Sequence, residues 1–272
     1  MNHFFFTPKE SPSDTVSSTL GSSDRTLLFS DEFNGTTVDE TKWNYCYDNY
    51  SAEYDGCTNF GNWEDEWYKK SQVAQRDGNL VLTAERKPID APTSVEGYIH
   101  TYPFTSGMVS TGAKDANSKP KHEFGYGYYE AKIFIPSGQA IWPAFWILPT
   151  DRSWPPEIDF MEVLGQKPNE LLATYHWRNA EDKVIHETTW HDAGTDLSLG
   201  WHTYAGNWQE GRIDWYLDDK LIKTETGENI PSKKMQIILN LAVGGNLPGK
   251  SDASTPDKAT MLVDYVRVYD KK

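Results

Sequence analysis

Three carboxylates fall within six residues in the segment that begins at Glu157 and reads Glu-Ile-Asp-Phe-Met-Glu. The intervening residues are apolar and favour a β-strand, where acids lose hydration, so their presence calls for a functional explanation. Side chains alternate between the faces of a strand, which puts Glu157 and Asp159 on one face and Glu162 on the other. A one-residue β-bulge at Phe160 or Met161 would return Glu162 to the shared face, and bulges are frequent beside active sites.

Acids that share a face can cleave a glycosidic bond when one is ionised and another holds a proton. Retaining glycosidases place the two carboxyl groups about 5–5.5 Å apart, and inverting enzymes place them about 6.5–9.5 Å apart. We expect the outer pair, Glu157 and Glu162, to converge to the retaining distance with Asp159 between them. Repulsion among the three acids raises the pKa of at least one and supplies the protonated acid. The alternative is a polar strand whose acids bind calcium or face water, which the apolar neighbours argue against.

Composition limits the partners that this chain can have. The formal net charge of −14 argues against nucleic acid and anionic membranes, because both would be repelled. No apolar run approaches the roughly 18 residues of a membrane span. A neutral polysaccharide is compatible with this charge, and the 11 tryptophans supply rings that either stack on sugars or pack in the core.

The chain is interpreted as one domain with a short lead-in. Residues 1–24 are rich in Ser, Thr, Asp and Pro and are predicted to be disordered, whereas residues 25–272 show no break in composition and form a single catalytic domain. No signal peptide is visible, since Phe4-Phe5-Phe6 is too short for its apolar core. Cys46 and Cys57 enclose a loop that a disulfide would pin, which suits a secreted protein; two free thiols are the alternative.

Alternating apolar and polar residues recur between turn signals and predict many short strands. One short helix is expected around residues 230–234, and the segment 99–121 is expected to be a loop that forms one wall of a cleft. The pattern predicts an all-β fold of two packed sheets, a sandwich or jelly roll, in which a bent sheet offers a concave face. The expected strands cover residues 27–33, 80–84, 126–135, 173–177, 201–208, 212–217, 235–242 and 261–269.

The acidic segment resembles the active-site signature of glycoside hydrolase family 16 in its bulged, laminarinase-like form. Further segments resemble the family's motifs in the family's order and together cover roughly residues 27–270. The resemblance implies a β-jelly-roll sandwich of two curved antiparallel sheets, concanavalin A-like, whose concave face forms the substrate cleft. The segments are Ser30-Asp31-Glu32-Phe33-Asn34-Gly35, Ile141-Trp142-Pro143-Ala144-Phe145-Trp146, Gly200-Trp201-His202-Thr203-Tyr204, Trp215-Tyr216-Leu217-Asp218, Leu239-Asn240-Leu241-Ala242-Val243-Gly244-Gly245-Asn246 and Val263-Asp264-Tyr265-Val266-Arg267-Val268-Tyr269.

The resemblance also implies roles for the catalytic residues. Glu157 is the expected nucleophile and Glu162 the general acid/base, with Asp159 hydrogen-bonded to the nucleophile. The implied mechanism is a double displacement with retention of configuration and needs no cofactor. His176 is expected to reach the acid/base region, with a core histidine as the alternative.

Aromatic residues and a metal site follow from the same resemblance. Trp142, Trp146 and Trp177 are expected to stack on sugars or shape the cleft. Core packing competes for one of Trp142 and Trp146, although residues four apart on a strand share a face. A structural calcium ion, bound partly through backbone oxygens, is expected at Glu32, Gly78 and Asp264; the alternative is that the two carboxylates make salt bridges.

Departures from the family's pattern concern the substrate rather than the chemistry. Asn62, Trp63 and Glu64 are expected to contact substrate, but the family usually reads Asn-Glu-x-Gln-Tyr here, and Trp63, Asp65 and Glu66 differ from it. Trp154-Pro155-Pro156 and Arg178-Asn179 also stand where the family usually has glycine.

The expected function is endo-acting hydrolysis of internal β-1,3 linkages in a laminarin-type β-glucan by a secreted monomer. A mixed-linkage β-1,3-1,4-glucanase, a β-galactan hydrolase and a transglycosylase remain alternatives within the family. A non-catalytic β-glucan-binding protein is the alternative from another class, and the retention of all three acids argues against it.

Overall fold

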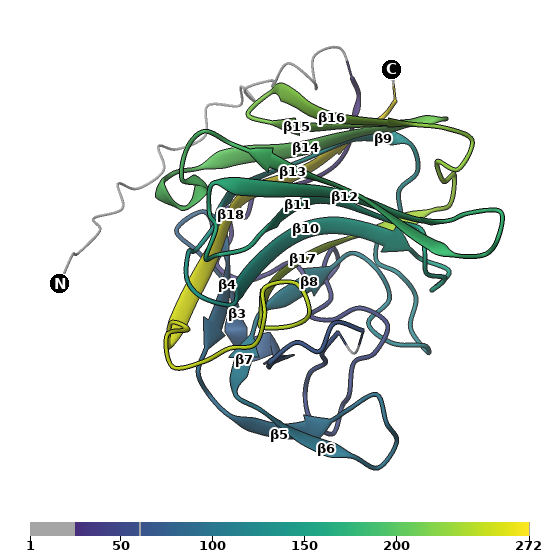
Figure 1. Cartoon of the computed structure of the whole chain (residues 1–272). Coiled ribbons are helices and arrows are strands. Elements are labelled where there is room, and N and C mark those ends of the chain that lie inside the picture. The colour runs from purple at the N-terminus through teal and green to yellow at the C-terminus, as the bar shows by residue number, and fades with distance from the viewer. Residues whose placement is uncertain (1–24, 60, 272) are drawn as a thin grey trace.

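The computed structural model of the chain describes residues 25–59 and 61–271 (Figure 1). The predicted disorder of residues 1–24 lies outside the described residues. The described residues are almost entirely strands and loops, with two short 3₁₀ helices, η1 and η2. The elements are β1 (Leu27–Asp31), β2 (Glu66–Tyr68), η1 (Lys70–Gln72), β3 (Val73–Arg76), β4 (Asn79–Glu85), β5 (Ile89–Pro92), β6 (Ile99–Tyr102), β7 (Phe104–Ser106), β8 (Met108–Ser110), β9 (Gly127–Phe134), β10 (Ile141–Pro149), β11 (Glu157–Val163), β12 (Glu170–Arg178), β13 (Val184–Asp192), η2 (Leu197–Leu199), β14 (His202–Gln209), β15 (Arg212–Leu217), β16 (Lys220–Thr226), β17 (Met235–Val243) and β18 (Lys258–Tyr269).

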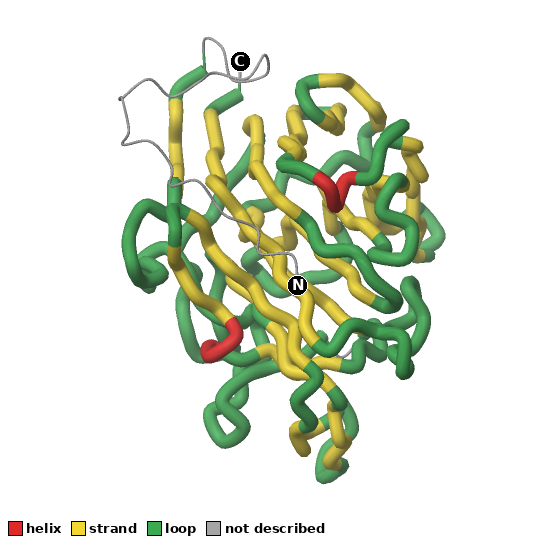
Figure 2. Tube along the Cα trace, turned by 90° about the vertical axis from the view of Figure 1, so that its left-hand side faces the viewer, coloured by secondary structure: helices red, strands yellow, loops and turns green. Residues whose placement is uncertain are grey.

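Two large sheets stack on each other, which confirms the predicted all-β jelly-roll sandwich (Figures 1 and 2). The ten-stranded sheet has the order β16-β15-β14-β9-β18-β4-β7-β2, with β1 paired to β18 and β3 paired to β4. The six-stranded sheet has the order β13-β12-β11-β10-β17-β8. All pairs are antiparallel except β2 with β7. Strands β5 and β6 form a separate hairpin that projects from one end of the molecule (Figure 1).

The six-stranded sheet has two faces of different character. One face packs on the other sheet and carries the large apolar residues of the core, such as Phe145, Phe160 and Leu239. The other face, here called the open face, is turned away from that core and carries the acids of β11. Alternation along β10 puts Trp142 and Trp146 together on the open face, so both belong to the same side of the sheet as the acids.

A β-bulge interrupts β11 at the predicted place. On β12 the single residue Ala173 lies opposite two residues of β11, Phe160 and Met161, because the register shifts between Asp159 and Glu162. Phe160 and Met161 both point into the core, where neither is exposed. Glu162 therefore returns to the open face beside Asp159, which confirms the bulge that the sequence predicts.

The second sheet holds this bulge in place. The Phe160 ring packs against Tyr129 of β9, with 5.4 Å between the ring centroids. Gly206 of β14 lies directly beneath the same ring, and a Cβ atom at that position would overlap it. The indole Nε1–H of Trp215 donates to the backbone carbonyl of Asp159 at 2.8 Å. The bulge is thus a product of the contact between the sheets as well as of β11 itself.

Two expectations about local structure were wrong. Residues 230–234 form no helix; Pro231 lies there, and its carbonyl accepts a hydrogen bond from the Trp208 indole at 2.9 Å. The segment 99–121 is not one loop, since it contains β6, β7 and β8. Its strands escaped prediction because they are only three or four residues long.

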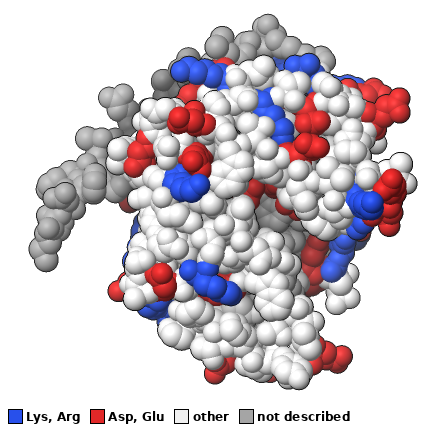
Figure 3. Space-filling view, in the orientation of Figure 1, with Lys and Arg blue, Asp and Glu red and all other residues white. Residues whose placement is uncertain are grey.

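Three other features of the fold bear on function. A disulfide joins Cys46 to Cys57, as the sequence analysis expects. No helix among residues 25–59 and 61–271 is both long enough and apolar enough to cross a membrane. Lysine and arginine side chains are scattered among acidic ones on the face in Figure 3 and form no basic patch there.

Gly206→Ala should disturb the bulge, because the added methyl group must displace the Phe160 ring. Overpacking of this kind costs about 1–3 kcal/mol of stability, and we expect activity to fall as well because Glu162 follows Phe160 closely. Thermal unfolding and activity assays measure both effects. Gly200→Ala is the control, since its new methyl group meets no atom closer than 3.8 Å. Equal behaviour of the two variants would contradict the role assigned to Gly206.

Candidate active site

The open face carries rows of side chains that run across the strands. Residues that pair directly in neighbouring antiparallel strands share a face, so each row can be read from the register. One row passes from Trp190 through Leu172, Glu162 and Ala144 to Asn240. The acids of β11 therefore lie in the middle of the sheet, with residues of β12 and β13 on one side and of β10 and β17 on the other.

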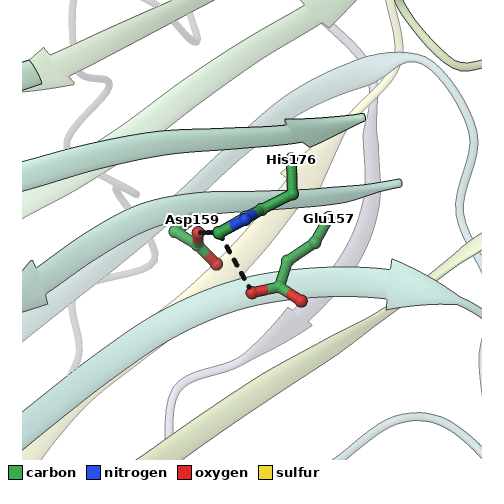
Figure 4. A group of neighbouring side chains, drawn as sticks. All are labelled: Glu157, Asp159 and His176. Atoms are coloured by element: carbon green, nitrogen blue, oxygen red, sulfur yellow. Dashed lines mark hydrogen bonds and ion pairs between the residues drawn. The ribbon is translucent and has the colours of Figure 1, made fainter. Parts of the chain in front are cut away.

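Glu157, Asp159 and His176 form a compact hydrogen-bonded group (Figure 4). His176 lies directly opposite Glu157 on β12. Its Nε2 atom is 3.0 Å from Oδ2 of Asp159 and 3.5 Å from Oε1 of Glu157. On its other side, Nδ1 of His176 is 2.5 Å from Nδ1 of His186. The imidazole thus bridges the expected nucleophile and Asp159, rather than reaching Glu162 as the sequence analysis expects.

The Glu157 carboxyl has a second partner that was not predicted. Oε2 of Glu157 accepts a hydrogen bond from the Trp154 indole at 2.6 Å. Trp154 belongs to the segment before β11 that departs from the usual glycine-containing sequence. This departure therefore contacts Glu157, one of the expected catalytic acids, and not only the surroundings of the cleft.

Glu162 is held separately from that group. Its Oε1 atom accepts from the Trp142 indole at 3.0 Å, and its Oε2 atom accepts from the Thr174 hydroxyl at 3.3 Å. Both donors lie on strands adjacent to β11. The carboxyl is consequently oriented at both oxygens on the open face, which suits a group that must pass a proton in a fixed direction.

Burial and mutual repulsion keep protons on these acids. Burial, followed by the neighbouring Asp159, raises the pKa of Glu157 to about 8, although His176 and Trp154 oppose the rise. Burial, followed by Glu157, raises the pKa of Glu162 to about 7. Burial and Glu162 raise the pKa of Asp159 well above its ordinary value. The acids titrate as one coupled set, so the cluster keeps at least one proton at neutral pH while another member ionises.

A hydrogen-bond chain links the open face to the loop before β2. The Trp146 indole donates to Asn240 at 2.7 Å, and Asn240 donates to the Tyr68 hydroxyl at 3.0 Å. Tyr68 donates to Glu64 at 3.3 Å, and Asn62 donates to the other oxygen of Glu64 at 3.3 Å. Trp146 and Glu64 are therefore parts of one buried polar network, and a change at one end is felt at the other.

Glu66 adds a buried carboxyl beside this chain. Its side chain is fully buried and accepts the Val243 backbone N–H at 2.8 Å. Burial and the adjacent Glu64 raise the pKa of Glu66 well above its ordinary value. When protonated, a carboxyl offers both a donor and an acceptor, as a glutamine amide also does, so a raised pKa suits Glu66 to the position where the resemblance expects glutamine.

Trp177 does not face the cleft, so that expectation was wrong. Its ring packs against the core between the sheets. The reason is strand alternation: His176 occupies the open face, and its neighbour in the strand must point to the opposite side. Trp63 lies apart from the acids, in the loop before β2, and its side chain is exposed.

Several residues of the site escaped sequence reasoning. Thr174 and Asn240 carry no catalytic signal, because isolated threonine and asparagine residues are common in strands and turns. Trp190 is 47% exposed and lies in the same cross-strand row as Glu162. The strand that carries it, β13, is absent from the predicted strands, so Trp190 gave no signal in the sequence.

The expected calcium residues lie in other interactions. Glu32 forms two hydrogen bonds with Arg267 at 2.9 and 2.8 Å, and Asp264 lies 3.0 Å from Lys132. Gly78 lies in the turn between β3 and β4. The salt bridges are therefore the role that the structure gives to these two carboxylates, and calcium binding stays a prediction.

One group in the described part of the chain has the geometry to hold a metal ion: Glu157, Asp159 and His176, whose ligand atoms lie within 4.8 Å of one another. These atoms already satisfy each other by hydrogen bonding. The arrangement as a whole provides one carboxyl bridged to a histidine and a second, separately oriented carboxyl on the same face. These two carboxyl groups can together perform nucleophilic attack and proton transfer.

The comparisons with known proteins agree with this geometry. The family described as "Glycosyl hydrolases family 16" matches residues 59–267. The chain is 33% identical over 261 residues to Endo-1,3-1,4-beta-glycanase ExsH of Rhizobium meliloti, covering 90% of this chain and 52% of that protein. It is 33% identical over 267 residues to a glucan endo-1,3-beta-glucosidase of Cryptopygus antarcticus, covering 89% of this chain and 90% of that protein.

A solved structure shows the same likeness in three dimensions. The laminarinase catalytic domain from Thermotoga maritima MSB8 superposes with a TM-score of 0.75 at 30% identity, covering 92% of this chain and 99% of that one. The chain spans about half the length of the two Rhizobium meliloti glycanases that it matches, 52% of each.

The raised pKa values predict that stability falls as pH rises. Above pH 4.5 the unfolded acids ionise while the folded cluster still holds protons up to about pH 7–8, so the folded state binds more protons and loses stability through this window. Glu157→Gln removes one such group, and its Tm should exceed that of the wild type by a few degrees at pH 8. The advantage should shrink toward pH 4.5. Calorimetry across this range, with the exposed Glu181→Gln as control, measures it; an advantage that does not change with pH would contradict the expectation.

Proposed function

The chain belongs to family 16 of the glycosyl hydrolases, and on this basis we propose that it is a retaining endo-β-glycanase that hydrolyses internal β-1,3 linkages of laminarin-type glucan. The observation that carries the proposal is the bulge at Phe160, which brings Glu162 onto the open face beside Glu157 and Asp159. Without it the second carboxyl would point into the core and no proton donor would face the glycosidic oxygen.

The mechanism follows from the two carboxyl environments. The reactive protonation state has Glu157 ionised and the proton on Glu162; because the pKa of Glu157, about 8, lies above that of Glu162, about 7, this state is the minor of the two singly protonated arrangements of the pair. From it Glu157, positioned by Trp154 and the bridging His176, attacks the anomeric carbon while Glu162 protonates the departing oxygen. A covalent glycosyl-enzyme forms and the leaving sugar departs. Glu162, now ionised, removes a proton from water, which attacks the anomeric carbon and releases Glu157. Retention of configuration results from the two successive inversions.

Asp159 influences the charge of the nucleophile, Glu157. It is almost fully buried and shares the His176 imidazole with Glu157. When Glu157 becomes an ester in the intermediate, its negative charge disappears, and the proton shared within this group can relocate without entering from solvent.

A neutral glucan suits the surface around these acids. The chain carries a net charge of −14, and the face shown in Figure 3 has no basic patch that would favour an acidic polymer. A relative named as an endo-1,3-beta-glucosidase and another named as an endo-1,3-1,4-beta-glycanase are equally similar to this chain, at 33% identity. A mixed-linkage β-1,3-1,4-glucanase is therefore the second candidate. The disulfide supports secretion, because such bonds persist in oxidising compartments.

Glu157→Gln should reduce hydrolysis by on the order of 10⁴-fold or more, since an amide cannot form the covalent intermediate. Folding and substrate binding should persist. Reducing-sugar release from laminarin, lichenan, agarose, β-galactan and xyloglucan measures the activity of both proteins. Release from laminarin that disappears in the variant supports the proposal. Release from another polymer alone would show that this polymer, and not laminarin, is the substrate. Normal turnover by the variant would overturn the mechanism.

Glu162→Ala should lower activity on laminarin by about 10²–10⁴-fold, and less on aryl glycosides whose leaving group needs no protonation. The wild-type rate should decline above about pH 7 as Glu162 loses its proton, and this decline should vanish in the variant. Added azide should restore turnover and yield a β-glycosyl azide, detectable by NMR. An α-configured product, or no rescue on an activated substrate, would contradict the assignment of Glu162.

A further inference from the structure

A pocket lies beside the open face, between the loop that precedes β2 and the β5–β6 hairpin. Its lining includes Trp63, Glu64 and Asn59 from the loop and His100 and Tyr102 from β6. The Tyr102 ring is nearly buried and contacts the His100 ring edge-on, with 4.8 Å between centroids. The pocket therefore combines aromatic surface with a few polar groups, which is the usual composition of a small-molecule site.

Trp63 forms the exposed wall of this pocket in an unusual conformation. Its side chain is 70% exposed, and its φ angle of 58° lies in the left-handed region that bulky residues rarely adopt. The surrounding chain holds it there: Lys250 donates to the Trp63 carbonyl at 3.0 Å and to Asp65 at 2.9 Å, and Asp65 accepts the Ser251 N–H at 2.7 Å. A strained backbone that presents a large apolar ring to water is typical of a binding position.

Shared side chains connect the pocket to the catalytic face. Glu64 lines the pocket and also ends the hydrogen-bond chain that begins at Trp146. At Gly245 a Cβ atom would lie 3.3 Å from the Trp142 ring and 3.4 Å from Glu64, so this backbone sits between the two side chains. Trp142 in turn donates to Glu162. The backbone at Gly245 therefore contacts both a residue that donates to Glu162 and a residue that lines the pocket.

The charges of the lining favour a neutral ligand. Lys250 lines the pocket, but its ammonium group is engaged by Asp65 and by the Trp63 carbonyl. Glu64 is buried and hydrogen-bonded to Asn62 and Tyr68. A pyranose ring, with an apolar face for the indole and hydroxyls for polar groups, matches this lining better than an anion does.

We propose that Trp63, with His100 and Tyr102, forms an outer subsite that binds one sugar residue of the glycan beyond those that contact the acids. This inference rests on the proposed function, because it assumes a polysaccharide in the cleft. The indole stacks on the sugar ring and contributes to the affinity for long chains. Short oligosaccharides that occupy only the centre of the cleft do not reach it.

Trp63→Ala tests the subsite, with linear β-1,3-gluco-oligosaccharides of increasing length and laminarin as substrates. Loss of one stacking contact should lower kcat/KM on the longest substrates by about three- to tenfold, through KM, and leave the shortest unchanged. Trp63→Phe should recover most of the loss. Leu221→Ala, which removes a 54% exposed side chain from β16 in the other sheet, is the matched control and should behave as the wild type.

Titration of the same oligosaccharides into Glu157→Gln and into Glu157→Gln/Trp63→Ala gives the affinities without turnover. A length-dependent loss of affinity in the double variant supports the subsite. Equal losses at every length, or no loss at any length while the wild type remains active, would overturn it. If the wild type cleaves no β-glucan, the proposed function fails instead, and the two failures are thus distinguishable.

Discussion

The bulge in β11 is the constraint on which the catalytic arrangement depends. A regular strand of the same sequence would send one of the outer glutamates into the core, where an ionisable group has neither water nor a partner. The extra residue, Phe160, is accommodated because Tyr129, Gly206 and Trp215 of the other sheet leave space for its ring and bind the backbone beside it. The packing between the two sheets therefore determines the position of the proposed proton donor, Glu162.

Clustering three acids on a largely buried face lowers the stability of the folded protein. The cluster is kept because the proposed chemistry requires all three acids on one face. The cluster is tolerable because each carboxyl has specific donors: Trp154 for Glu157, His176 for Asp159, and Trp142 with Thr174 for Glu162. These donors come from three different segments of the chain. The site consequently works as a set of oriented carboxyl groups that exchange protons locally, in a sheet rigid enough to hold them.

The sheet and the loops have different roles in the cleft. Residues of β10 to β12 provide the chemistry, whereas the loop before β2 and the β5–β6 hairpin surround one end of the cleft. The chain of hydrogen bonds from Trp146 to Glu64 ties these regions together. Departures from the family's usual pattern concentrate in the loops and around Trp154. Such a chain can therefore differ in its preferred glycan while the reaction stays the same.

The amino-acid sequence by itself determined the fold class and the strand core, and it singled out the three acids of β11 as the proposed catalytic groups. Alternation along segments such as 126–135 is a local property, and the observed strand β9 spans Gly127–Phe134. The crowding of acids in an apolar strand is equally local, which is why the bulge could be predicted from six residues. The same rule, applied to His176 and Trp177, would have excluded Trp177 from the cleft, because neighbours in a strand face opposite ways.

Tertiary structure alone decided which side chains meet. The partners of the acids, among them Trp154, Thr174 and His186, come from segments whose proximity depends on strand order and register. The very short strands β7 and β8 form because pairing partners elsewhere in the chain, β2 and β4 for β7 and β17 for β8, stabilise them, so their own composition gives little signal. The pocket at Trp63 likewise exists only where a distant hairpin meets its loop. Contacts between residues far apart in the chain leave no local pattern in the sequence. These contacts orient the three acids and so form the site.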